Sequence, residues 1–176
     1  MYAAEIPSPR IVQMLIAAGS DVNGYIHEFY AHPEGDVDMG YWSPLSHALN
    51  ASNKAGGLDV VNLLLEAGAD PNPPEPWGKT VMEKAIAMGL RRLWPVLLRA
   101  GAVLPTRVAD WMSRRSYQTN RADPYLLRVE SAGGFQAHET AHREKVLASF
   151  TPKFTHLVPP ELVPLIVEYV FHFGFY

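Results

Sequence analysis

One segment of this chain occurs three times, and this repetition constrains the fold more than any other feature. Ile11–Asn23 (IVQMLIAAGSDVN) matches Val60–Asn72 (VVNLLLEAGADPN), and Leu93–Val103 (LWPVLLRAGAV) repeats the pattern. The aligned glycines are Gly19, Gly68 and Gly101. The second spacing is 33 residues, and the first is 49, which is 33 plus an insertion of 16. Tandem copies at such a period predict similar units that each bury an apolar face against their neighbours.

Each copy predicts a helix that ends at its glycine. In the middle copy, the apolar residues of Val60–Leu65 form a wide helical face that a neighbour would bury. Gly68 follows, where a residue with positive φ closes the last turn without steric cost. The side chains of Asp70 and Asn72 suit turns because they bond nearby backbone amides, and Thr80 suits the N-cap of a second short helix. Each unit is therefore expected to be a helix, a turn and a helix, with a hairpin-like loop between units.

These features resemble the ankyrin repeat. The family's Gly-Ala-Asp-Val-Asn turn appears as Gly68–Asn72 (GADPN), and its Thr-Pro-Leu segment appears in Gly78–Met82 (GKTVM) and Ser43–Ala48 (SPLSHA). The resemblance spans about three repeats in residues 9–105 and implies an all-α fold, an ankyrin-repeat α-solenoid. The first repeat keeps only its second helix, after Ser8 as N-cap. A truncated cap or a lost upstream segment would account for this.

Two domains are predicted. Residues 1–105 hold the repeats, with an insertion at 24–42, and residues 106–176 form a helical C-terminal extension that caps the stack. About four further inserted residues fall near Asn50 to Gly57. Helical patterns in the extension begin at Thr106 and continue over Asp123–Gly133, Phe135–Phe150 and Pro160–Phe173.

The insertion at 24–42 is both aromatic and acidic. Aromatic side chains supply large contact area at modest entropic cost and are enriched at binding hot spots. The segment is therefore predicted to contact a partner. The alternative is that its rings fold back onto the repeats. The candidate residues in this segment are Tyr25, His27, Phe29, Tyr30, Tyr41 and Trp42.

The resemblance to ankyrin repeats implies a binding surface made of hairpin tips and of the first helices. It adds His47, Trp77 and Lys79 to the predicted partner-binding residues. The function that we expect from the sequence is a non-catalytic protein–protein interaction module, an adaptor or structural subunit of a larger assembly, with no cofactor.

Two other interpretations remain open. Residues 157–169 are similar to the opening helix of an F-box, which would make the chain a substrate receptor of a ubiquitin ligase; the alternative is the capping helix. His138, Glu139 and His142 satisfy H-E-x-x-H, the pattern of a zinc metalloprotease. Such a site needs a third protein ligand, and Arg143 would place a cation beside the metal. The sequence therefore favours no metal site.

Composition excludes several classes of function. The 15 Lys and Arg against 18 Asp and Glu give a net charge of -3, so nucleic acid is not the expected partner. The absence of Cys excludes disulfides and thiolate chemistry. The start of the chain lacks a secretory signal, and Leu162–Tyr176 is too short to span a bilayer as a helix. We predict a soluble, cytoplasmic or nuclear protein, with an organelle lumen or surface and the oligomeric state left open.

Overall fold

The computed structural model describes most of the chain, in two compact units that are residues Met1–Arg121 and Ala122–Tyr176. The described residues are 2–4, 6, 8–30, 37–74, 79–105, 118, 120–154 and 157–172. Residues 106–117 lie outside the described residues. The predicted domain boundary after residue 105 adjoins this segment, and the predicted helix from Thr106 falls in it. That boundary and that helix stay predictions.

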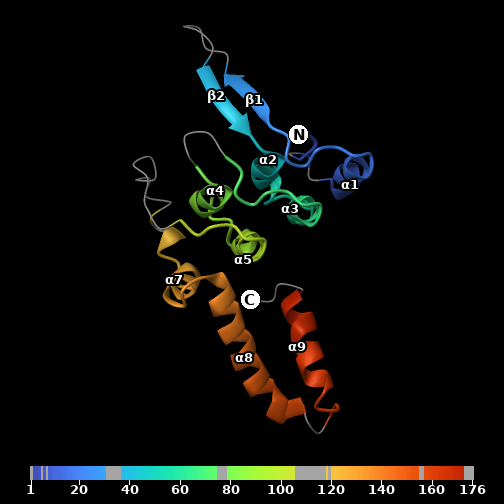
Figure 1. Ribbon diagram of the computed structural model, residues 1–176, viewed down its shortest axis with the longest axis vertical. Coiled ribbons are helices and arrows are strands. Elements are labelled where there is room, and N and C mark those ends of the chain that lie inside the picture. Colours follow the sequence, from blue (N-terminus) through green and yellow to red (C-terminus); the bar gives the residue numbers. More distant parts are fainter. Residues whose placement is uncertain are drawn as a thin grey trace. The chain divides into compact units, whose positions relative to one another are not determined.

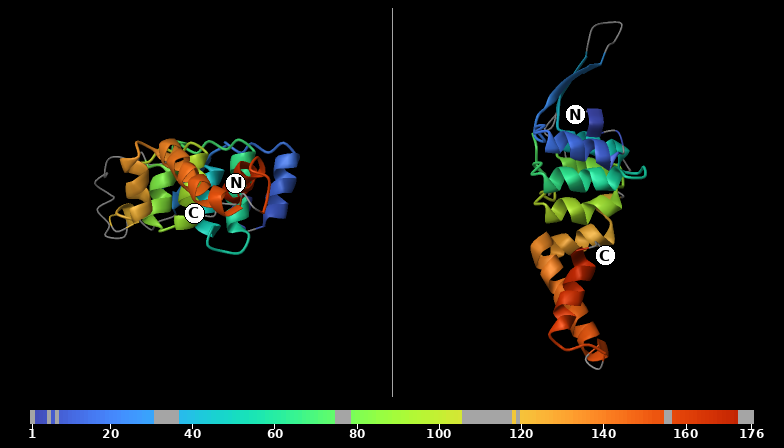
Figure 2. Two further views of the ribbon diagram at one scale, coloured as in Figure 1. Left: turned by 90° about the horizontal axis from the view of Figure 1, so that it is seen from below. Right: turned by 90° about the vertical axis from the view of Figure 1, so that its right-hand side faces the viewer.

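Helix pairs of the first unit stack in the order of the sequence (Figure 1). The elements are η1 (Tyr2–Ala4), α1 (Pro9–Ala17), β1 (Ile26–Tyr30), β2 (Val37–Trp42), α2 (Pro44–Ala51), α3 (Gly57–Glu66), α4 (Val81–Ala87), η3 (Arg91–Leu93) and α5 (Trp94–Arg99). Within pairs, α2 contacts α3 and α4 contacts α5; between layers, α1 contacts α3 and α2 contacts α4. Figure 2 shows these layers from the side. The predicted helical solenoid is confirmed.

Apolar side chains between the helix pairs form the core of the first unit. Its largest fully buried members are Leu45, Leu49, Val60, Val61, Val81, Met82, Ile86, Trp94 and Leu97. They come from both helices of each pair and from successive layers. Each repeat therefore depends on its neighbour to remove its apolar face from water.

Each second helix ends at the glycine that the sequence predicted. The backbone φ angles are 83° at Gly19, 88° at Gly68 and 98° at Gly101. In the middle unit the glycine amide donates to the Leu65 carbonyl at 3.0 Å, and the next amide donates to the Leu64 carbonyl at 2.9 Å. This pair of bonds is the Schellman motif, which satisfies carbonyls that the helix end leaves open.

The predicted N-caps are also present. The Thr80 hydroxyl accepts a bond from the Glu83 amide at 3.1 Å, and the Glu83 carboxylate accepts one from the Thr80 amide at 2.8 Å. This reciprocal capping box fixes the start of α4. Burial raises the pKa of Glu83 above its ordinary value, and the bond from Thr80 partly offsets the rise. Ser8 occupies the N-cap of α1 with Pro9 at the first helical position, without a side-chain cap bond.

Two asparagines join successive turns of the stack. The Asn23 side-chain amide donates to the Gly68 carbonyl at 3.0 Å, and its side-chain oxygen accepts from the Asp70 amide at 2.8 Å. Asn72 occupies the equivalent position one unit later. Its own backbone amide donates to the Asp70 carboxylate at 2.8 Å, which is the local turn bond that the sequence predicted. The bonds between turns are additional, and they connect one repeat to the next.

The asparagine connection gives a first testable prediction. Asn72→Ala removes a bond to the Gly101 carbonyl at 2.9 Å and one from the Val103 amide at 2.8 Å. Each such bond contributes about 0.5–1.5 kcal/mol net, so the variant is expected to lose about 1–2 kcal/mol of unfolding free energy in urea, measured by circular dichroism. Asn53→Ala, at an exposed position, is the control and should change stability by less than about 0.5 kcal/mol. Equal losses in the two variants would contradict the role of Asn72.

The second unit consists of α7 (Pro124–Ser131), α8 (Phe135–Phe154) and α9 (Leu162–His172). α8 contacts both α7 and α9. α7 begins after Asp123 as predicted, and the Asp123 carboxylate caps the helix by accepting from the Tyr125 amide at 2.9 Å. The predicted end of α8 at Phe150 is wrong, because the helix continues by one turn through Pro152. A proline this close to a helix end removes one backbone bond and leaves only a short segment to be displaced.

No described helix combines the length and the apolar character that crossing a membrane requires.

Candidate functional site

The insertion at 24–42 forms an antiparallel hairpin of β1 and β2 (Figure 1). His27 pairs with Tyr41 and Glu28 with Gly40, and a bulge follows between Glu28 and Phe29. Gly40 has a φ of 80°, which suits the irregular register at this point. The sequence identified the insertion as an enlarged hairpin loop but not its strands. The available signal was the alternation of ring-bearing residues at 25, 27 and 29, which is the period of a strand.

Trp42 anchors the base of the hairpin on the helices. The Lys84 ammonium lies 4.9 Å from the centre of the Trp42 ring, and the His47 ring meets the same ring edge-on at 6.5 Å and 72°. The ammonium also donates to the Ser46 carbonyl at 2.8 Å and to the Ser46 hydroxyl at 3.1 Å. Three elements, β2, α2 and α4, therefore meet at one indole. For Trp42, the structure favours the alternative in which the ring folds back onto the repeats.

Tyr41 and its neighbours form a different part of the hairpin. The Tyr41 ring stacks on the His27 ring at 4.3 Å with 10° between their planes. Tyr41 and Tyr25 are exposed, and His27 is half-buried. These three residues, which we call the hairpin aromatic patch, combine apolar ring surface with polar groups that water reaches.

The other predicted partner-binding residues are distributed differently. His47 is buried beneath the hairpin base, and Lys79 is half-buried just before α4. Phe29 and Tyr30 belong to β1, and their side chains lie outside the described residues, as does the whole of Trp77. The structure thus brings Trp42 and His47 together on one side of the hairpin base, and His27 and Tyr41 together on the hairpin. The sequence missed Lys84, which is 42 residues from Trp42 and has no local motif.

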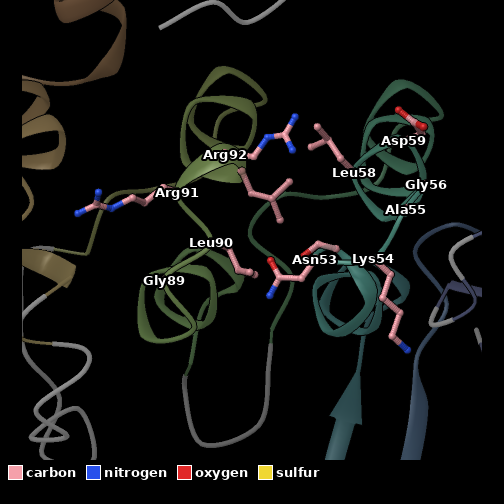
Figure 3. Close-up of a pocket in the computed structure, with 12 residues that line it drawn as sticks. Asn53, Lys54, Ala55, Gly56, Leu58, Asp59, Gly89, Leu90, Arg91 and Arg92 are labelled. Carbon is pink, nitrogen blue, oxygen red and sulfur yellow. The ribbon is translucent and has the colours of Figure 1, made fainter.

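A cavity of about 480 Å³ lies between the turn that joins α2 to α3 and the turn that follows α4 (Figure 3). Its lining residues are Ser52, Asn53, Lys54, Ala55, Gly56, Leu58, Asp59, Gly89, Leu90, Arg91, Arg92 and Leu93. The first of these turns contains the shorter insertion that the sequence indicated. In Figure 3 the Arg92 guanidinium lies beside Leu58, whereas Lys54 and Arg91 point outward to opposite sides. The charged groups do not converge, so the cavity defines no ligand.

The H-E-x-x-H residues lie on α8 of the second unit. The His138 and His142 rings are parallel within 5°, with centres 6.2 Å apart, and His138 meets Tyr125 edge-on at 5.6 Å. Both histidines and Glu139 are half-buried. Among the residues that the structure describes, no three His, Cys, Asp or Glu gather closely enough to hold a metal ion. We therefore propose no hydrolase.

The histidine pair gives a second testable prediction. Burial lowers the pKa of His138 below its ordinary value, the charges of His142 and Arg128 lower it further, and Glu139 raises it. His142→Gln is expected to raise the pKa of His138, and Glu139→Gln to lower it, in an NMR titration of the ring protons. Shifts of the same sign in both variants would contradict this electrostatic account.

The lowered pKa of His138 also sets a direction for stability. The unfolded chain takes up this proton at a higher pH than the folded chain does. The stabilising contribution is therefore complete above the unfolded value of about 6.5 and is lost as the pH falls through the folded value.

Stacked helix pairs, each ended by a left-handed glycine, define a helical-repeat protein of the solenoid class. Comparison with known proteins identifies the repeat. Residues 41–75 match the family model of the ankyrin repeat. The "Putative ankyrin repeat protein YahD" of Escherichia coli (strain K12) is 35% identical over 83 residues, which cover 44% of this chain and 40% of that relative. No solved structure matches the chain.

The chain contains an ankyrin repeat. It spans less than half the length of the relative that it matches. Ankyrin repeats are generally protein–protein interaction modules and are typically non-catalytic.

Proposed function

We propose that this chain is a non-catalytic adaptor or structural subunit that binds another protein through the hairpin aromatic patch of Tyr25, His27 and Tyr41. One observation carries the proposal: Trp42 fixes the base of the hairpin to α2 and α4, while Tyr25 and Tyr41 remain exposed. The anchoring ring of Trp42 and the exposed ring of Tyr41 belong to β2, and Tyr25 directly precedes β1, the strand that pairs with it. The patch is therefore held in place before a partner arrives.

Holding the hairpin in place favours binding, because ordering a mobile hairpin at an interface would cost part of the binding free energy. An isolated two-stranded hairpin is marginally stable in water. Here the Lys84 ammonium contacts the Trp42 ring and also bonds Ser46, so the hairpin base is tied to two helices. A surface that is ordered in the free protein loses less entropy on binding. In this proposal Trp42, His47 and Lys84 act by positioning the patch.

Charge indicates what kind of partner surface fits. The insertion at 24–42 contains the acids Glu28, Glu34, Asp36 and Asp38, and neither Lys nor Arg. Complementary charge speeds encounter and disfavours wrong partners. We therefore propose a partner surface that is basic around an apolar centre, into which the two tyrosine rings fit.

Site-specific crosslinking tests the proposal. A photoreactive benzoylphenylalanine at position 41 is expected to capture a defined protein from the source cells. The same group at position 103, which is also exposed but belongs to the turn after α5, should not capture that protein. The captured protein is then purified and titrated with the unmodified chain by calorimetry.

Two paired variants complete the design. Tyr25→Ser with Tyr41→Ser should weaken binding of the captured protein at least tenfold, because each truncated aromatic anchor costs about 1–2 kcal/mol or more. Met88→Ser with Val103→Ser removes exposed apolar side chains elsewhere in the same unit and should leave binding unchanged. Equal affinities of the two double variants would refute the assignment of the patch.

A further inference from the structure

Asn23 is the only asparagine of the sequence that is followed by glycine. A side chain on the following residue hinders the approach of its backbone nitrogen to the asparagine side chain, and Gly24 carries none. Asn23 is exposed and lies between α1 and β1. The Gly24 amide donates no hydrogen bond to any residue that the structure describes. The Gly24 nitrogen is therefore available to react with the neighbouring side chain.

Two hydrogen bonds hold the Asn23 side chain between the repeats. Its amide donates to the Gly68 carbonyl at 3.0 Å, and its oxygen accepts from the Asp70 amide at 2.8 Å. Both bonds are exposed to water, and exposed bonds of surface turns open locally far more often than those of the core. Each opening leaves the side chain free to turn toward the Gly24 nitrogen.

Asn72 occupies the matched position one repeat later but has a different neighbour. Its side chain makes the same pair of bonds, to the Gly101 carbonyl at 2.9 Å and from the Val103 amide at 2.8 Å. The next residue is Pro73, whose nitrogen carries no hydrogen to give up. The same structural position is thus reactive in the first turn and inert in the second, and the following residue makes the difference.

We propose that Asn23 is a modification site at which the chain deamidates without an enzyme. The Gly24 nitrogen forms a bond to the Asn23 Cγ atom, and the bond from Cγ to Nδ2 breaks. The Gly24 amide proton leaves with the side-chain nitrogen as ammonia, so the product is a cyclic succinimide. One water molecule then opens the ring. Opening at Cγ gives aspartate, and opening at the main-chain carbonyl carbon gives isoaspartate.

Either product breaks the connection between the first and second repeats. A carboxylate in place of the amide has no hydrogen to donate, and its negative charge faces the Gly68 carbonyl oxygen instead. Isoaspartate also routes the backbone through an additional methylene group. The modified turn is therefore expected to hold the second repeat less tightly. This inference does not rest on the proposed partner of the hairpin.

Incubation of the full chain in mildly alkaline water enriched in heavy oxygen tests the reaction, because each opened ring retains one labelled oxygen atom. Tandem mass spectrometry of peptides then locates the label, which should appear at residue 23. The exposed Asn53, which is followed by lysine, should stay unlabelled over the same period. Equal labelling of residues 23 and 53 would overturn the proposal.

Gly24→Ala separates the role of the following residue from that of exposure. The variant should label about tenfold more slowly, which corresponds to about 1.4 kcal/mol of barrier. The φ angle of Gly24 is outside the left-handed region, and the nearest atoms to a Cβ here belong to the exposed Asp21 side chain, so alanine is accommodated. An unchanged rate of labelling would overturn the proposal.

Pro73→Gly moves the reactive pair to the second turn. Asn72 should stay unlabelled in the wild type and become labelled in this variant. Pro73 is buried, so circular dichroism should first establish that the variant folds. A folded variant in which Asn72 remains unlabelled would contradict the proposal, and the Gly24→Ala result decides it where the variant does not fold.

Asn23→Asp reproduces one product and tests its consequence. The variant is expected to lower the ratio of folded to unfolded chain about tenfold in urea, the effect of losing one hydrogen bond and placing a charge beside its acceptor. Asn53→Asp adds the same charge at an exposed position and should leave the ratio nearly unchanged. Equal ratios in the two variants would refute the loss of the connection between repeats.

Discussion

Trp94→Ala is expected to lower the unfolding free energy of the repeat unit by about 3–5 kcal/mol, the range for truncating a buried tryptophan. Trp94 is 1% exposed and lies in the first turn of α5. It occupies the position that Val61 holds one repeat earlier, so the last repeat fills a larger volume with one ring. The total unfolding free energy of a small domain is about 5–15 kcal/mol, so this loss is a large fraction of the stability.

A second substitution separates packing from hydrogen bonding at this position. The Trp94 indole N–H donates to the Ala85 carbonyl at 3.2 Å, and that carbonyl also accepts from the Leu90 amide at 2.9 Å. Trp94→Phe leaves the carbonyl bonded and retains much of the ring, so a loss of about 1–2 kcal/mol is expected.

Urea denaturation followed by circular dichroism at 222 nm measures both losses of unfolding free energy. Tryptophan fluorescence does not suit this comparison, because replacing Trp94 changes the signal itself. Met88→Ala, at an exposed position near α4, is the control and should stay within about 0.5 kcal/mol of the wild type. A loss below about 1 kcal/mol for Trp94→Ala would show that this ring is not a main support of the last repeat.

Gly57→Ala is expected to lower the unfolding free energy by a similar amount, about 3 kcal/mol or more, for a different reason. A Cβ atom at this position would lie 2.1 Å from the Ala51 carbonyl oxygen and 2.7 Å from the Cα atom of Ser52. Both are backbone atoms, one at the end of α2 and one at the start of the turn between α2 and α3, so the backbone itself has to move. That turn is already held by bonds from the Gly57 amide to the Lys54 carbonyl at 3.0 Å and from the Lys54 amide to the Ala51 carbonyl at 2.9 Å. Overpacking usually costs 1–3 kcal/mol, and a clash with fixed backbone lies at the upper end or beyond.

Gly68→Ala is the matched control for Gly57→Ala. Gly68 has a φ of 88°, and a Cβ atom there would meet nothing within 4 Å. Its cost is limited to left-handed strain of about 1–2 kcal/mol. Thermal unfolding should therefore rank wild type above Gly68→Ala and Gly68→Ala above Gly57→Ala. The reverse order of the two variants would contradict the role assigned to the α2–α3 turn.

The two glycines also show how far the sequence could predict the structure. Gly68 was predictable because its requirement is local: a helix ends, and the next residue needs a positive φ. Gly57 begins a helix, and its requirement comes from the close approach of Ala51 across the turn. No rule about the spacing of residues in a sequence predicts how closely Ala51 approaches Gly57.

The candidate site divides in the same way. The aromatic insertion at 24–42 was identifiable from composition, and alternation places Tyr41 and Trp42 on opposite faces of a strand. Which of the two faces meets the helices depends on Lys84 and His47, which the sequence alone does not place near Trp42. The face that we propose to bind a partner is therefore a consequence of how the hairpin docks.

By itself, the sequence determined the repeats, the glycines that end their helices, the cap at Thr80 and the helix start at Asp123, because each depends on residues a few positions apart or on a constant period. The tertiary structure alone decided the asparagine bonds between turns and the contact of Lys84 with Trp42. These contacts join residues that are distant in sequence, so they exist only once the helices have packed.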